Sequence, residues 1–132
     1  MGNKARPTAA QLYQRMAETM VDALETDGKL LCLAEAGQAW ASVAVFSSDN
    51  EAVHYHEVDT EDEEDVLSSL AMEAWEAEPL RNRWSMMELV VENGQFDAEF
   101  TFPDEFDAEE DGFERRNRIV RKHFGDKPIK YD

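Results

Sequence analysis

The chain has 132 residues, of which 42% are hydrophobic and 10% aromatic. This length suits one domain covering residues 1–132, and the apolar content is enough for a sizeable core, which excludes a disordered chain. The formal net charge is −17, from 30 acidic and 13 basic residues. A surface of that sign repels phosphate groups, so it disfavours direct binding to nucleic acid or to an anionic membrane.

The charge is distributed unevenly along the chain. Residues 1–114 hold 28 acids and 6 bases, whereas residues 115–132 hold 7 bases and 2 acids. The sequence therefore predicts an acidic body with a basic C-terminal segment.

Cysteine usage and hydropathy indicate a cytoplasmic protein. Cys32 is the only cysteine, so it forms no internal disulfide, and the leucines around it indicate a buried strand thiol. The N-terminus lacks the apolar core of a signal peptide, and no stretch approaches the roughly 20 apolar residues that a membrane span needs.

The first predicted element is a helix, which follows a loose terminus of residues 1–6. Thr8 and Gln11 have the spacing of a capping box, in which each side chain satisfies a backbone donor of the other residue. Apolar residues then recur at helical spacing as far as Leu24, and Gly28 provides a stop. We expect this apolar stripe to pack on the core.

Three strands and a second helix follow. Residues 29–36, 39–46 and 52–58 read as short strands separated by turn residues, which is typical of an antiparallel meander. The segment Thr60-Glu61-Asp62-Glu63 repeats the capping-box pattern. The apolar stripe behind it reaches Trp75, and Pro79 ends the helix.

The strongest local signal is Asn93-Gly94 between two runs of strand-forming residues. Both residues tolerate the positive φ angles of a two-residue hairpin turn. If Glu92 pairs with Gln95, the register of both strands follows from the turn. That register puts the large apolar residues of the second strand on one side, which we expect to be core: Phe96, Phe100 and Phe102.

The same register places Glu88 directly opposite Glu99 on the other side of the hairpin. Like charges in that position are unfavourable, so this pair should either lie in water or be neutralised by a basic group or a metal ion.

A last helix and an extended tail complete the chain. Residues 103–112 form a polar, acidic loop, and Asp111 is placed to cap a helix that runs to about Phe124. We expect apolar anchors at Phe113, Val120 and Phe124. We expect the basic residues of this helix to stay near the solvent: Arg115, Arg116, Arg118, Arg121 and Lys122. Residues 126–132 are predicted as an extended tail.

Together these elements predict a single α+β domain with an antiparallel sheet of about five strands. An N-terminal, a middle and a C-terminal helix accompany the sheet.

Candidates for catalysis or metal binding are few. His54 and His56 lie two apart on a predicted strand and so share one face, but no third ligand stands at a recognisable spacing. The acids of residues 104–111 lack the spacing of a calcium-binding loop. There is no glycine-rich phosphate loop, GxSxG elbow or CxxC motif. The sequence predicts no catalytic residue, no metal and no cofactor.

The unusual feature is the density of acids. Residues 57–65 hold seven acids in nine positions, and residues 97–114 hold nine in eighteen. Such density either serves solubility or guides docking to a basic partner.

The C-terminal half resembles the YezG-like family of bacterial immunity proteins. The likeness covers about residues 84–128 and lies in three stretches: the run from Trp84 through the Asn93-Gly94 turn to Asp104, then Phe113-Glu114-Arg115-Arg116, and His123-Phe124-Gly125-Asp126. The resemblance implies an α+β antitoxin that blocks a cognate bacterial toxin, often a nuclease, by direct binding.

An acidic inhibitor suits a nuclease, because the enzyme must present basic residues to its phosphate substrate. The predicted partner-binding residues are Glu57, Asp59, Glu61, Asp62, Glu63, Glu64, Asp65, Glu88, Glu99, Asp104, Asp107 and Asp111. Two alternatives stay open: a homodimeric regulatory or interaction domain, and a small metal-dependent hydrolase that uses His54, His56 and carboxylates.

Overall fold

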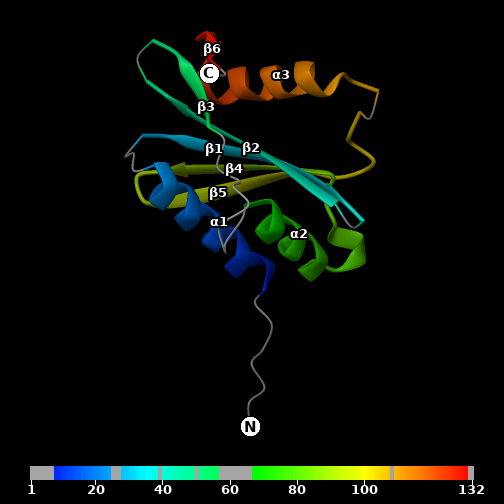
Figure 1. The fold of residues 1–132 in the computed structure, drawn as a ribbon. Helices are drawn as coiled ribbons and strands as arrows, with labels where there is room; N and C mark the ends of the chain where they lie inside the picture. The colour runs from blue at the N-terminus through cyan, green and yellow to red at the C-terminus, as the bar shows by residue number, and fades with distance from the viewer. Residues whose placement is uncertain are drawn as a thin grey trace.

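A six-stranded sheet separates a pair of helices from a single helix on its other face (Figure 1). The computed structural model describes residues 8–24, 28–38, 40–49, 51–56, 67–107 and 109–130. The helices are α1 (Ala9–Leu24), α2 (Leu67–Ala77) and α3 (Gly112–Phe124). The strands are β1 (Leu30–Gly37), β2 (Trp40–Ser48), β3 (Val53–His56), β4 (Met86–Glu92), β5 (Gln95–Thr101) and β6 (Ile129–Lys130). This arrangement confirms the predicted α+β class and its three helices.

The strands lie in the order β5-β4-β1-β2-β3-β6, and every neighbouring pair is antiparallel except β3 with β6. The meander of β1, β2 and β3 is confirmed. The expectation of about five strands was one too few, because β6 lies within the segment predicted as an extended tail. Val53 N–H donates to the carbonyl of Pro128 at 2.8 Å and joins the two segments. A strand of two residues has no period to detect, so the sequence pattern could not predict it.

β1 is the central element and is buried on both faces. Leu30, Cys32 and Ala34 pack towards α1 and α2, whereas Leu31 and Leu33 pack towards α3. Side chains of a strand point alternately to opposite faces, so an unbroken apolar run is the expected sequence of a strand covered on both sides. The predicted buried setting of Cys32 is confirmed.

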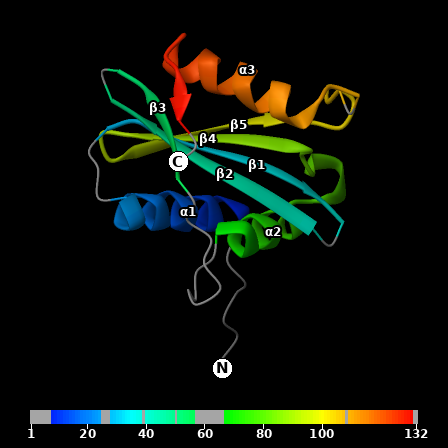
Figure 2. The ribbon, with the colours of Figure 1, turned by 45° about the horizontal axis from the view of Figure 1, so that its top comes forward.

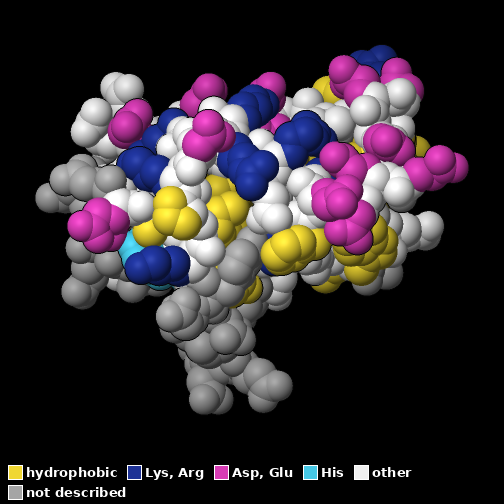
Figure 3. Space-filling view, turned by 90° about the horizontal axis from the view of Figure 1, so that it is seen from above, with side chains coloured by type: hydrophobic (Ala, Val, Ile, Leu, Met, Phe, Trp, Pro, Cys, Tyr) yellow, Lys and Arg dark blue, Asp and Glu magenta, His cyan; other side chains and the backbone are white. Residues whose placement is uncertain are grey.

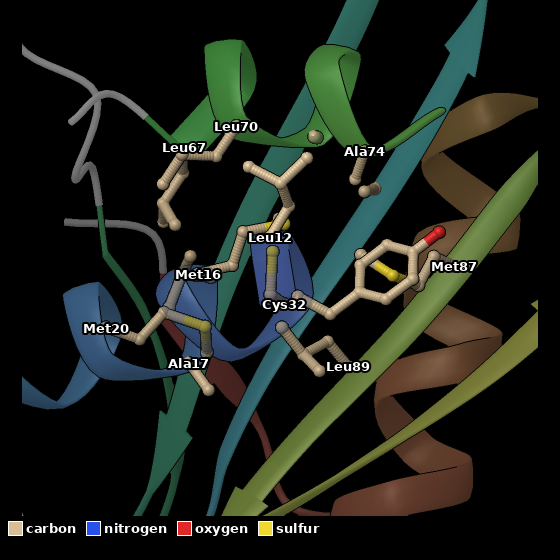
Figure 4. Packing of buried hydrophobic residues seen from close by; sticks show 14 of the residues in the cluster. Leu12, Met16, Ala17, Met20, Cys32, Leu67, Leu70, Ala74, Met87 and Leu89 are labelled. Atoms are coloured by element: carbon tan, nitrogen blue, oxygen red, sulfur yellow. The ribbon is translucent and has the colours of Figure 1, made fainter. Parts of the chain in front are cut away.

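The helix pair forms the thicker half of the core. Figure 2 shows α1 and α2 side by side beneath the sheet, and α3 above it. Figure 4 shows side chains from both helices and from the sheet meeting between them. The buried residues that α1 contributes to this cluster are Leu12, Tyr13, Met16, Ala17 and Met20. Those of α2 are Leu67, Leu70, Ala71 and Ala74.

The start of α1 confirms the predicted capping box. Thr8 N–H donates to Gln11 Oε1 at 2.8 Å, and Gln11 N–H donates to Thr8 Oγ1 at 3.1 Å. The helix α2 ends at Ala77, two residues before Pro79, as predicted. The second predicted capping box, at residues 60–63, lies outside the described residues.

The predicted hairpin register is confirmed along its whole length. Asn93 and Gly94 have φ angles of 54° and 76°, and Glu92 pairs with Gln95. One expectation was wrong: Phe100 and Phe102 pack against the core, but Phe96 is exposed. Phe96 lies on the edge strand beside the turn, where it lines an open pocket together with Ala17 and Val21 of α1.

The last helix is anchored by a different set of residues from the one expected. Asp111 is the N-cap and accepts a hydrogen bond from Glu114 N–H at 3.1 Å, as predicted. Val120 and Phe124 are buried as expected, but Phe113 is largely exposed and Ile119 is buried. Phe113 occupies the first turn, beyond the apolar stripe that faces the sheet.

Through its hydroxyl group, Tyr13 joins α1 to the segment between α2 and β4. The hydroxyl donates to Glu78 Oε2 at 3.0 Å and accepts from Trp84 Nε1 at 2.8 Å. Burial raises the pKa of Tyr13 well above its ordinary value, and the neighbouring Glu78 carboxylate adds to the rise, although the Trp84 bond opposes it.

We expect the free energy of unfolding to fall as the pH rises above about 10, the ordinary pKa of tyrosine. In that range the unfolded chain loses the Tyr13 proton while the folded chain keeps it, so stability falls by up to about 1.4 kcal/mol per pH unit. Below pH about 10 this contribution is complete. Urea unfolding between pH 8 and pH 11 measures the fall, and Tyr13→Phe is the control. An equally steep fall in the variant would assign it to other groups.

Candidate functional site

The carboxylates of Glu88 and Glu99 form the centre of a charged cluster beneath α3. The hairpin register sets them opposite each other on β4 and β5, on the α3 face of the sheet. Glu88 is only 3% exposed, whereas Glu99 reaches the solvent. A buried carboxylate next to a second one requires a compensating positive charge.

The compensating charge comes from the end of α3. Lys122 Nζ donates to Glu88 Oε1 and to Glu99 Oε2, at 2.9 Å in each case. His123 Nε2 lies 2.7 Å from Glu88 Oε1. Partial burial opposes the charge on Lys122, but its bonds to the two carboxylates outweigh burial and raise its pKa. The sequence left open whether water, a basic group or a metal ion accommodates the Glu88 and Glu99 pair. In the structure a basic group does so, and it is Lys122 of the same chain.

Arg115 is the second fixed cation of the cluster. It is 5% exposed and donates to the carbonyl of Asp107 at 2.7 Å and to that of Glu110 at 3.0 Å. Its guanidinium also lies 3.4 Å from the carboxylate of Glu35 and stacks over the ring of Phe106 at 4.2 Å. The expectation that Arg115 stays near the solvent was wrong, because the acidic loop folds back over it and supplies its acceptors.

Glu110 connects the loop to the exposed side of α3. Arg118 donates to its two carboxylate oxygens at 3.1 and 3.0 Å. These bonds lower the pKa of Glu110 and raise that of Arg118. Arg118 is exposed, as the sequence predicted.

A pocket of about 280 Å³ opens between α3, the β4–β5 hairpin and the loop of residues 102–111. Its charged lining comprises five carboxylates and three cations: Glu88, Glu99, Glu105, Asp107, Glu110, Arg115, Arg118 and Lys122. Met86, Thr101 and Phe106 complete the wall. The pocket therefore has an excess of negative charge and a partly apolar wall, which suits a cationic group better than an anion.

The structure brings some of the predicted partner-binding residues together and separates others. Glu88, Glu99 and Asp107 line the pocket, whereas Asp104 is exposed outside it and Asp111 serves as the cap of α3. The predicted segment at residues 57–65 lies outside the described residues.

His54 and His56 do not meet at a common point. His54 Nε2 lies 2.8 Å from Asp49 Oδ2, and His56 Nε2 lies 2.6 Å from Ser47 Oγ. The bond from His54, together with two backbone donors, holds the pKa of Asp49 well below its ordinary value. Burial, and then the nearby His54, lower the pKa of His56. Within the described residues, the donor atoms close enough to share a metal belong to Glu88, Glu99 and His123 instead, and lie within 4.8 Å of one another.

The sequence predicted neither the contact of His123 with Glu88 nor the burial of Arg115. Residues four apart on a helix share a face, so the spacing of Arg115, Ile119 and His123 places all three on the side that packs on the sheet. This spacing could have predicted that Arg115 and His123 face the sheet. The many basic residues of the segment instead favoured the prediction of a solvent-exposed face.

Among the described residues, the helices are too short or too polar to cross a membrane. No known protein-family model matches the chain, and no curated protein matches it.

Proposed function

We propose that this protein is an acidic binding module that neutralises a basic bacterial toxin by direct contact, as an immunity protein does. The observation that carries the proposal is the dense acidic surface formed by β5, the loop after it and the start of α3. Residues 97–114 hold nine acids. Within the described part of the chain, the ion pairs of this stretch involve Glu99 and Glu110. Among the described residues, the other seven carboxylates of this stretch have no ion-pair partner.

The position of these carboxylates supports docking. Acidic side chains gather at the end of the α3 face where the loop meets the helix, while Lys and Arg side chains occupy the middle of that face (Figure 3). Repulsion between neighbouring carboxylates destabilises the folded chain. A basic partner that covers this acidic surface would relieve the repulsion. Charge complementarity of this kind speeds encounter and fixes orientation.

The test is a double charge reversal in the exposed loop, Asp104→Lys with Glu105→Lys. The matched control is Glu73→Lys with Glu76→Lys on the exposed side of α2, which changes the net charge equally. Pull-downs from native lysate at low salt, with mass spectrometry of the retained proteins, should recover a basic toxin that salt releases. The loop variant should lose at least 10-fold of this capture, and the control should keep it.

Two outcomes would contradict the proposal. Equal losses in both variants would mean that net charge alone drives retention. Recovery of nothing but the protein itself, together with salt-sensitive self-association in light scattering, would favour the alternative of a homodimeric regulatory domain. Thermal unfolding of each variant checks that the fold is kept.

A further inference from the structure

The pocket beneath α3 contains a buried acceptor atom to which no described residue donates. Among the described residues, both hydrogen bonds of the Glu88 side chain go to its Oε1 atom. The second oxygen, Oε2, has no donor in that set, although Glu88 is 3% exposed and lines the pocket. A buried carboxylate oxygen without a donor is costly, so a donor arriving in the pocket is favoured.

Lys122 is the cation that can give way to such a donor. Its side chain is 47% exposed, whereas those of His123 and Arg115 are 14% and 6% exposed. Lysine is a flexible, strongly hydrated point charge, so its ammonium can move into the solvent when an incoming cation takes over its bonds to the two carboxylates. His123 would stay in contact with Glu88 during the exchange.

The shape and charge of the pocket fit a guanidinium group better than a metal ion. A guanidinium presents several donors in a planar fork and can bond Glu88 and Glu99 together, including the unused oxygen. The pocket volume of about 280 Å³ accommodates an arginine side chain, and Met86 and Phe106 offer apolar surface to its methylene groups. A metal ion would use the three donor atoms but leave most of this space unfilled.

We propose that the pocket receives one arginine side chain of the basic partner, whose guanidinium replaces Lys122 between Glu88 and Glu99. The proposal rests on the proposed function and names its anchoring contact. In the free protein Lys122 occupies the position of this guanidinium and neutralises the buried carboxylate of Glu88 until the partner docks.

The test uses Nα-acetyl-arginine amide as the probe and the full-length protein labelled with nitrogen-15. We expect saturable amide shifts centred on Glu88, Glu99 and Lys122, and none with the uncharged citrulline analogue. Lys122→Met removes the competing ammonium and should tighten binding at least 3-fold. Glu99→Gln removes one carboxylate charge on the exposed side of the pocket and should weaken binding at least 3-fold, so the test holds even if the Lys122 variant folds poorly.

Several results would overturn the inference. Shifts scattered over the surface, or equal affinity in wild type and Glu99→Gln, would mean nonspecific charge attraction. Weaker binding in a folded Lys122→Met variant would show that the lysine does not compete. Stoichiometric binding of Mn²⁺ or Zn²⁺ to that variant without binding of the arginine probe would make the cluster a metal site. If Glu99→Gln captures the salt-released basic partner as well as wild type does, the pocket inference fails while the proposed function stands.

Discussion

Replacing Arg115 with methionine is expected to lower the free energy of unfolding by about 2–4 kcal/mol. The substitution keeps an unbranched apolar stem but removes the guanidinium, so the carbonyls of Asp107 and Glu110 lose their donor. It also removes the cation beside Glu35. Removing one partner of a fully buried ion pair costs about 3–5 kcal/mol. The cost here is in or below the lower part of that range, because Glu35 and Glu110 keep some contact with water.

Chemical denaturation measures the loss, and Arg121→Met is the control. Arg121 lies on the exposed side of the same helix, so its replacement should change stability by less than about 0.5 kcal/mol. Amide exchange in the loop of residues 103–111 should speed up in the Arg115 variant alone. A loss below 1 kcal/mol, or unchanged exchange in the loop, would mean that the loop is held by other contacts.

Replacing Trp84 with alanine should cost about 3–5 kcal/mol, the largest effect of any single change considered. The indole is fully buried, its Nε1 donates to Tyr13, and its backbone carbonyl accepts from Trp75 Nε1 at 2.8 Å. Its ring also lies 6.1 Å from that of Phe100. Truncation therefore leaves a large cavity where α1, α2 and β4 meet.

The matched control is Trp40→Ala, because Trp40 is half-exposed on β2. We expect that variant to lose no more than about 1.5 kcal/mol, and Trp84→Phe to fall between the two. Guanidinium unfolding of the three variants ranks them. If the Trp40 variant loses as much stability as the Trp84 variant, burial of the Trp84 indole is not what stabilises this part of the core.

Local sequence signals predicted the local parts of the fold. The Asn93-Gly94 turn predicted a register that holds along the whole hairpin, and the two capping residues Thr8 and Asp111 predicted where helices begin. Each of these depends on residues a few positions apart, so one sequence is enough to identify it.

Features that depend on distant segments were not predictable. The burial of Arg115 needs Glu35, which is 80 positions away, and β6 needs β3 as its partner. The pairing of Glu88 with Glu99 was predicted, but the neutralising charge of Lys122 and the contact of His123 with Glu88 were not. Only the packing of α3 across the sheet brings these groups together.

The two edges of the sheet differ in a way that affects how the protein behaves at high concentration. One edge is closed by the short strand β6, whereas β5 forms the other edge. An edge strand with free backbone groups is a template for fibril growth. Asp97 and Glu99 on β5 place like charges against any second copy that approaches in register. The carboxylates that are proposed to attract a basic partner thus also oppose edge-to-edge pairing of two copies of the chain.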